Sequence, residues 1–136
     1  MRIIREPIPD VLIYRPSFGY SHPLKTDFKK GRLPIKYDLG GYELNKDNVT
    51  LDHVIPKSQG GTSTLDNYVL ATRDFNNYRG VVPLAKLITK EMFDKWAKQF
   101  ENLTVCGIKG TEYTKMIAKK IWGKWCLKIY VTKLES

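Results

Sequence analysis

The segment from Thr50 to Gly61 places a histidine directly after an aspartate, at the end of a short apolar run and before a loop with Pro56 and two glycines. Proline interrupts strand pairing and glycine permits backbone angles closed to other residues, so a strand is predicted to end here. Neighbouring residues of a strand point to opposite faces, so Asp52 and His53 can approach one group from two sides only where the strand ends or bends. The segment therefore predicts an acid and a base side by side at a strand-to-loop turn.

The Asp-His pair has the chemistry that hydrolysis of a phosphodiester requires. An imidazole has an unperturbed pKa near neutrality, so His53 is a candidate general base for an attacking water. The carboxylate of Asp52 can hold a hard divalent cation, which neutralises charge on the phosphate and on the departing 3′ oxygen. Lys57 in the following loop could contact a phosphate or be an ordinary surface charge. An isolated Asp-His pair is more often a turn or a surface pair, so this interpretation depends on the residues that follow.

The Asp-His pair is followed, in order, by Gly60-Gly61, Asn67, Asn76 and Arg79-Gly80. This order resembles the HNH endonuclease family, whose metal-binding ββα unit carries Asp-His, a central Asn and a final His or Asn. The resemblance covers roughly residues 37–80, and the nine-position step from Asn67 to Asn76 agrees with the spacing in the family.

The resemblance implies a role for each matching residue. His53 would activate the water, and Asn67 would steady the histidine and its loop, so these two are the predicted catalytic residues. Asp52 and Asn76 would hold the metal ion. Arg79 stands where the family usually has a basic residue before Gly, a position suited to a phosphate contact. The alternatives are that Asn67 only caps a turn and that Arg79 is a surface charge.

The family's structural zinc site is not matched, because its four cysteine positions correspond here to Tyr37, Gly40, Thr72 and Phe75. Loss of all four ligands together predicts that no structural zinc is bound and that packing, such as Tyr37 against Phe75, replaces it. Asp52 with Asn76 is an all-oxygen pair, which favours Mg²⁺ or Mn²⁺ at the catalytic position. Asn77 is the alternative to Asn76 as the second ligand.

The chain of 136 residues fits a single domain, and its 42% apolar and 27% charged content are those of a soluble globular protein. Residues 1–40 form a basic segment that is expected to be extended, because its five prolines disfavour a helix. Residues 41–80 hold the ββα unit, and residues 81–136 form a basic helical extension that ends in a strand. The expected fold is a small α+β domain built around a ββα-metal motif.

Within the ββα unit, strands are predicted at Val49 to Leu51 and Tyr68 to Ala71, and Thr72 and Gly80 are predicted to bound a helix over Asp74 to Tyr78.

Two amphipathic helices are expected next. The first starts at Thr89 and buries Met92, Phe93, Trp96 and Phe100. The second is capped by Thr111 and buries Tyr113, Met116, Ile117 and Ile121. Short strands are predicted at Val11 to Tyr14 and, by alternation, at Trp125 to Thr132.

Basic residues are concentrated at the two ends of the chain. Residues 1–40 carry 8 Lys and Arg against 4 Asp and Glu, residues 41–80 carry 4 against 5, and residues 81–136 carry 11 against 5. A slightly acidic centre between basic arms is typical of a phosphate-backbone binder with a metal site, although any single lysine is as readily a solvated surface group. The candidate DNA contacts in the arms are Lys29, Lys30, Arg32, Lys115, Lys119 and Lys120.

The remaining chemistry-bearing residues carry little functional signal. His22 has no acidic neighbour in the sequence and is interpreted as a turn or surface residue. Two cysteines, Cys106 and Cys126, are too few for a disulfide framework and are expected to be reduced. No apolar run approaches the length needed to span a membrane, so a cytoplasmic location is expected, or the host-cell cytoplasm for a phage-encoded chain.

The sequence therefore predicts a metal-dependent HNH endonuclease that hydrolyses DNA. The alternative is a DNA-binding accessory module with the same fold and little cleavage activity, and an RNA-directed protein is a third interpretation because backbone charge does not distinguish RNA from DNA. A homodimer or association with a larger DNA-processing complex is compatible with either interpretation.

Overall fold

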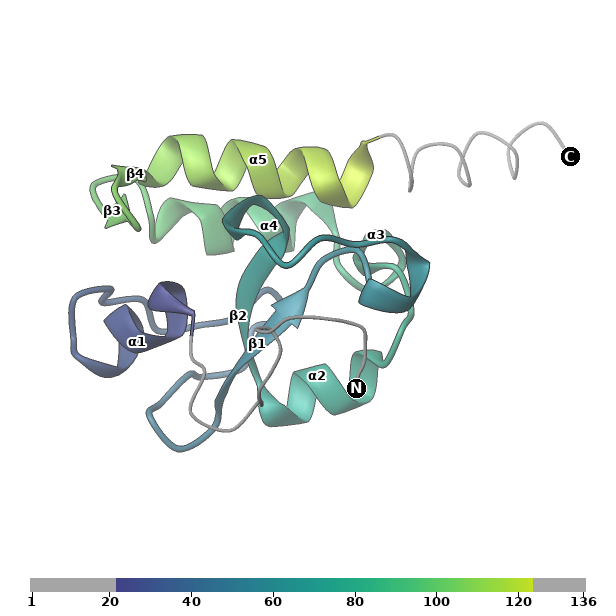
Figure 1. Ribbon diagram of the computed structural model, residues 1–136, viewed down its shortest axis with the longest axis horizontal. Helices are drawn as coiled ribbons and strands as arrows, with labels where there is room; N and C mark the ends of the chain where they lie inside the picture. Colours follow the sequence, from purple (N-terminus) through teal and green to yellow (C-terminus); the bar gives the residue numbers. More distant parts are fainter. Residues whose placement is uncertain (1–21, 124–136) are drawn as a thin grey trace, which may run out of the picture.

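An antiparallel hairpin lies at the centre of the computed structural model, which describes residues 22–123 (Figure 1). Strand β1 (Val49–His53) pairs with β2 (Tyr68–Thr72), and the register runs from Val49 opposite Thr72 to His53 opposite Tyr68. Both strands appear at the predicted positions and are longer than expected, β1 by two residues and β2 by one. The predicted strands at 11–14 and 125–132, and Cys126, lie outside the described residues.

Helix α2 (Arg73–Arg79) follows β2 directly and completes a ββα unit. The Thr72 hydroxyl accepts a hydrogen bond from the Phe75 amide at 3.1 Å, which satisfies one of the free N–H groups of the first turn. Gly80 ends the helix at a φ of 54°, a backbone angle that favours glycine. The predicted order of strand, loop, strand and helix is confirmed, and the chain has the α+β fold that was expected.

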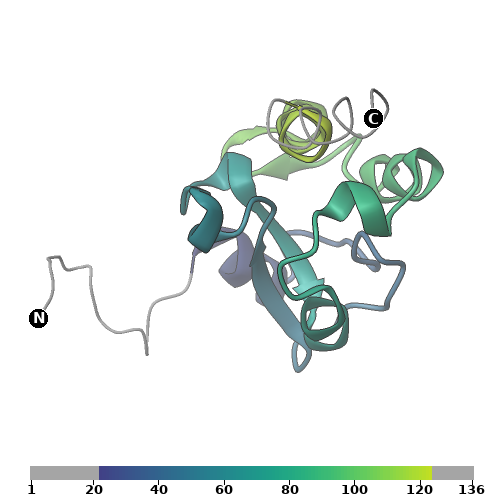
Figure 2. The ribbon, with the colours of Figure 1, turned by 90° about the vertical axis from the view of Figure 1, so that its right-hand side faces the viewer.

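Helices α4 and α5 lie on the other side of the hairpin from α2 (Figures 1 and 2). The helix predicted to start at Thr89 is α4, and the Thr89 side chain caps it by accepting from the Met92 amide. Thr111 was wrongly predicted to cap α5, which begins at Gly110 with Lys109 as its N-cap. The elements after α2 are α3 (Leu84–Leu87), α4 (Lys90–Lys98), β3 (Thr104–Val105), β4 (Ile108–Lys109) and α5 (Gly110–Trp122).

The prediction that residues 1–40 are extended is wrong for α1 (Pro23–Lys29). Pro23 occupies the first turn of this helix, where a missing N–H costs nothing and the fixed φ already suits a helix. His22 caps the helix, because its Nδ1 accepts a hydrogen bond from the Leu24 amide at 3.1 Å. Proline therefore marks the start of a helix here rather than its exclusion.

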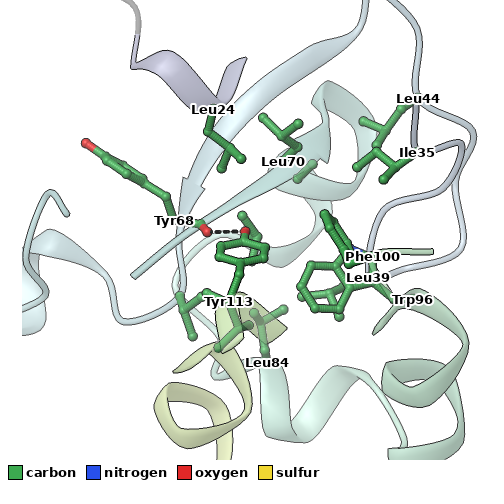
Figure 3. Packing of buried hydrophobic residues seen from close by; sticks show 14 of the residues in the cluster. Leu24, Ile35, Leu39, Leu44, Tyr68, Leu70, Leu84, Trp96, Phe100 and Tyr113 are labelled. Carbon is green, nitrogen blue, oxygen red and sulfur yellow. Dashed lines mark hydrogen bonds between the residues drawn. The ribbon is translucent and has the colours of Figure 1, made fainter. Parts of the chain in front are cut away.

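The hydrophobic core joins the hairpin to the C-terminal helices (Figure 3). Phe93, Trp96 and Phe100 are buried as the helical pattern predicted, and the rings of Trp96 and Phe100 lie 4.8 Å apart. Tyr113 on α5 is fully buried and donates its hydroxyl to the Tyr68 carbonyl at 2.6 Å, which fixes the end of the hairpin to α5. Among the described helices none is long and apolar enough to cross a membrane.

The positions that match the family's zinc ligands surround a buried aspartate, Asp38. Its Oδ1 accepts from the amides of Gly40 and Tyr42 at 3.0 and 2.9 Å. Its Oδ2 accepts from the amide and the hydroxyl of Thr72, both at 2.8 Å. One carboxylate thus ties the 38–42 loop to the point where β2 becomes α2, which is the connection that a zinc ion would make.

The predicted packing of Tyr37 against Phe75 is wrong. Tyr37 is half exposed, and Phe75 instead packs against Tyr42, with the ring centroids 5.8 Å apart. Gly40 allows this contact, because a Cβ there would approach the Phe75 ring to 2.5 Å. The loop therefore turns its glycine, rather than Tyr37, toward the aromatic ring.

Replacing Asp38 with Ala should lower the free energy of unfolding by about 3 kcal/mol or more, since it leaves buried donors without an acceptor. Thermal and denaturant unfolding measure the loss. Asp47→Ala is the matched control, because Asp47 is an exposed carboxylate in a neighbouring turn and should change stability by no more than about 0.5 kcal/mol. Equal stability of the two variants would show that the Asp38 hydrogen bonds do not hold the loop.

Candidate active site

The two candidate chemical residues of β1 lie on opposite faces of the hairpin. Thr50 and Asp52 face α2, where they contact Asn76 and Arg79. His53, the last residue of the strand, lies on the other face, with its ring centroid 4.9 Å from that of Tyr68. The strand runs two residues beyond its predicted end and stops at His53, so the acid and the base approach the same strand end from two sides.

Asp52 is buried and paired with Arg79, whose guanidinium donates to Asp52 Oδ2 at 2.8 Å. Burial raises the pKa of the Asp52 carboxyl above its ordinary value, and the positive charge of Arg79 opposes that rise. The pair fixes the position of the carboxylate at the junction of β1 and α2.

The predicted phosphate contact of Arg79 is wrong, because this side chain has no exposed surface. Its guanidinium also donates to the carbonyls of His53, Val54 and Val82. A guanidinium offers five N–H donors in a fixed planar fork, which suits such a set of carbonyls. Arg79 therefore holds the end of β1 against the loop that follows α2.

Asn76 lies on α2 beside the strand and is half-buried, whereas Asn77 is exposed. The side-chain nitrogen Nδ2 of Asn76 donates to Thr50 Oγ1 at 3.1 Å. Thr50 and Asp52 are two positions apart on β1 and share a face, so Asn76 lies on the same side of the strand as Asp52. Between the two asparagines, this placement favours Asn76 as the partner of Asp52.

The side-chain oxygens of Asp52 and Asn76, between β1 and α2, suit a hard cation that keeps water or phosphate oxygens as its other ligands. An ionised carboxylate has about four lone-pair sites, so Arg79 occupies only part of Asp52. With Nδ2 of Asn76 bonded to Thr50, the amide oxygen Oδ1 has no hydrogen-bond partner among residues 22–123. No group of three or more His, Cys, Asp and Glu side chains gathers in that range, and Mg²⁺ characteristically uses one or two protein carboxylates rather than a full protein cage.

His53 is held by Ser63, whose Oγ lies 3.1 Å from Nε2 of the imidazole. Burial, together with the positive charges of Lys57 and Arg79, lowers the pKa of His53 below its ordinary value of 6.5. All three effects disfavour the imidazolium. The histidine is therefore neutral at pH 7, as a general base must be.

Asn67 is fully buried and organises the loop after β1 rather than touching His53. Its Oδ1 accepts from the Ile55 amide, and its Nδ2 donates to the carbonyls of Ile55 and Thr62 at 3.0 and 2.9 Å. Gly61 lets the loop pass close by, since a Cβ there would meet the Ile55 carbonyl oxygen at 1.7 Å. Asn67 therefore steadies the loop that carries Ser63.

The lysines and the arginine predicted to contact DNA are spread over several surfaces. Lys57 lies exposed in the loop after β1, while Lys29, Lys30 and Arg32 lie at and after the end of α1. Arg32 is paired with Asp27 at 3.3 Å.

The three lysines of α5 that were predicted to face outward, Lys115, Lys119 and Lys120, do not share one face. Lys115 and Lys119 are exposed, and Lys115 lies 4.0 Å from Glu112. Lys120 turns instead toward the loop before β2, where it lies 3.3 Å from Asp66 and is only partly exposed. The prediction that all three lysines share an outward face is thus wrong for Lys120.

Two contributors to the site were missed by sequence reasoning. Ser63 stands in a run of polar loop residues in which nothing distinguishes it. Tyr68 could have been found, because the residue after Asn67 begins β2 and an antiparallel register places it opposite the end of β1.

Comparison with known proteins identifies the segment that contains these residues. The model of the HNH endonuclease family matches residues 40–77, which contain both strands of the hairpin and most of α2. No curated protein and no solved structure matches the chain. The resemblance inferred from Asp52, His53, Asn67 and Asn76 is therefore confirmed: the central unit of this chain is an HNH endonuclease motif, which indicates a function of the nuclease type.

Proposed function

We propose that the protein is a metal-dependent endonuclease that hydrolyses phosphodiester bonds in DNA. The observation that carries the proposal is the end of β1, where a buried carboxylate faces α2 and a neutral imidazole lies on the opposite face. The match to the HNH endonuclease family supports the class of reaction. The basic residues outside the central unit support a polyanionic substrate.

In the proposed reaction, His53 takes a proton from a water molecule that attacks the scissile phosphorus. In this proposal the imidazole carries its proton on Nε2 and donates it to Ser63 Oγ, 3.1 Å away, so that the lone pair of Nδ1 takes the proton of the water. The bond from phosphorus to the 3′ oxygen breaks opposite the attacking water. The departing 3′ oxygen takes a proton from solvent, so the products carry a 5′-phosphate and a 3′-hydroxyl.

Asp52 and Asn76 would hold a divalent cation, with Mg²⁺ or Mn²⁺ favoured by the two oxygen donors. Such an ion, when bound, stabilises negative charge on the phosphate and on the leaving oxygen. Arg79 and Thr50 orient the two ligands from the same side of the strand. No zinc is needed for the fold in this proposal, because Asp38 joins the segments that the family's zinc would join.

Incubation of supercoiled plasmid with the protein tests the proposal. Cleavage should occur with Mg²⁺ or Mn²⁺ and stop when a chelator is added, while the melting temperature of the protein stays unchanged by the chelator. Asp52→Asn should weaken binding of the cation, so that cleavage needs a higher cation concentration, which a titration of the cation measures. Absence of cleavage at every cation concentration would refute the proposal, and unfolding on chelation would reveal a structural metal.

A DNA-binding module with little cleavage activity is the second candidate. It is favoured by the close ion pair of Asp52 with Arg79, since an oxygen already held by a guanidinium is a poorer metal ligand. This candidate predicts that wild-type protein binds duplex DNA and leaves plasmid intact in the same incubation.

Lys57 should set the pH at which activity begins. Its charge lowers the pKa of His53, so Lys57→Gln should raise that pKa and move the acidic limb of the rate profile to higher pH. The variant should then lose more activity than wild type below pH 6.5, the ordinary pKa of histidine. Single-turnover cleavage at saturating DNA measures this independently of any binding defect.

Lys46→Gln is the control for this prediction, because Lys46 is an exposed lysine that is not among the charges acting on His53. A cation held by Asp52 would also disfavour the imidazolium, so it does not reverse the expected direction. Identical profiles for Lys57→Gln and wild type would show that Lys57 does not tune the base.

A further inference from the structure

His22, the other histidine of the chain, and the candidate base His53 both pack against the ring of Tyr68. The ring of His22 is 4.8 Å from that of Tyr68, and the ring of His53 is 4.9 Å from the same tyrosine. The three residues come from the start of α1, the start of β2 and the end of β1. His22 is thus part of the surroundings of the candidate site.

His22 carries its ring proton on a defined nitrogen. Nδ1 accepts a hydrogen bond from the Leu24 amide, so the neutral ring must bear its proton on Nε2. Burial lowers the pKa of His22, which keeps the ring neutral at pH 7. Within the described part of the chain Nε2 has no hydrogen-bond partner, so it is a neutral donor that is still available.

The hydroxyl of Tyr68 is a second donor, on the ring that packs against His22. The backbone of Tyr68 is held by Tyr113, while its side chain, which is itself buried, extends away from the other labelled core residues with the hydroxyl outermost (Figure 3). Oη has no hydrogen-bond partner among the residues that the structure describes. The oxygen keeps some exposed surface, although Tyr68 as a whole is only 6% exposed.

We propose that the Nε2–H of His22 and the hydroxyl of Tyr68 form a subsite for a phosphate of the DNA strand, adjacent to the phosphate that is attacked beside His53. The inference rests on the proposed function and extends it to a second contact with the same substrate. Phosphate oxygens accept hydrogen bonds from neutral side chains as well as from lysine and arginine, and such contacts fix the register of the nucleic acid.

Neutral donors leave a distinctive signature in binding. A lysine that neutralises a phosphate releases counterions, so its removal flattens the dependence of affinity on salt. Donors without charge contribute hydrogen bonds but release no counterions. Loss of either donor should therefore weaken binding by about 10-fold while the slope of log Kd against log salt stays unchanged.

Two conservative variants separate this role from packing. Tyr68→Phe removes the hydroxyl and keeps the ring between the two histidines. His22→Asn removes the imidazole and keeps a side-chain oxygen that can cap α1, since asparagine is a favoured N-cap residue. Tyr42→Phe is the matched control, because Tyr42 is a partly exposed tyrosine that stacks on Phe75. Melting temperatures verify that each variant is folded.

Binding of a short DNA duplex to each variant is titrated at several salt concentrations, and plasmid cleavage is followed at saturating protein. The proposal expects weaker binding by Tyr68→Phe and by His22→Asn, with an unchanged salt slope. Unchanged affinity of both variants would overturn it. A fall in the cleavage rate with affinity intact would also overturn it, because the stack would then only position His53.

The same experiment separates this inference from the proposed function. If wild type binds and cleaves DNA while both variants match it, the subsite alone is refuted. If wild type neither binds nor cleaves, the proposed function is refuted and the subsite falls with it.

Discussion

Replacing His53 with Ala is expected to lower the rate of DNA cleavage at saturating substrate by ~100-fold or more, the usual contribution of a general base. Binding of DNA should remain close to that of wild type, because the imidazole acts on water in the transition state rather than on the ground-state substrate. Single-turnover cleavage of plasmid measures the first quantity, and a duplex titration measures the second.

Gln59→Ala is the control for this experiment, since Gln59 is an exposed side chain in the loop that follows His53. It should leave the rate unchanged. His53 also packs against Tyr68, so the melting temperature of His53→Ala must be checked before its rate is interpreted. Cleavage by a folded His53→Ala protein at nearly the wild-type rate would remove His53 from the role of base.

The hairpin and its helix could be predicted from the sequence because each depends on local chemistry. The short apolar run that forms β1 and the Thr72 cap of α2 act over a few residues, and both elements are present in the structure. Thr89 and the buried aromatic face of α4 were predictable for the same reason. The order Asp52, His53, Asn67, Asn76 then identified the motif, because it depends on spacing rather than on contacts.

The errors lie where long-range contacts decide the structure. A proline disfavours a helix only beyond the first turn, and Pro23 stands within it. The sequence pattern before residue 40 does not show where a helix begins. In the loop at Asp38, Tyr42 rather than Tyr37 covers Phe75, because four hydrogen bonds to the Asp38 carboxylate fix the path of the loop. A single aspartate in a polar loop gives no signal of that role in advance.

Arg79 was misassigned for a more general reason. The resemblance to the family suggested a phosphate contact at this position, and a charged residue near a candidate active site is usually exposed. Arg79 lies four residues after Phe75, however, and both occupy the buried face of α2. The buried Asp52 on β1 supplies the charge that such an arginine requires.

This arrangement predicts that Arg79→Ala destabilises the protein by about 3 to 5 kcal/mol, because it leaves a buried carboxylate without its partner. The loss is measured by denaturant unfolding. The carbonyls of His53, Val54 and Val82 lose their donor in the same variant. Arg79→Lys should recover only part of the stability, since an ammonium cannot reproduce the planar set of donors.

Arg73→Ala is the matched control on the same helix, because Arg73 is exposed and donates to the Asp47 carbonyl from the surface. It should cost no more than about 1 kcal/mol. Removing the carboxylate as well, in Asp52→Asn with Arg79→Met, should restore part of the stability lost in Arg79→Ala, since no unpaired charge is then buried. A stable Arg79→Ala protein whose only defect is a flatter salt dependence of DNA binding would instead return Arg79 to the role of a phosphate contact.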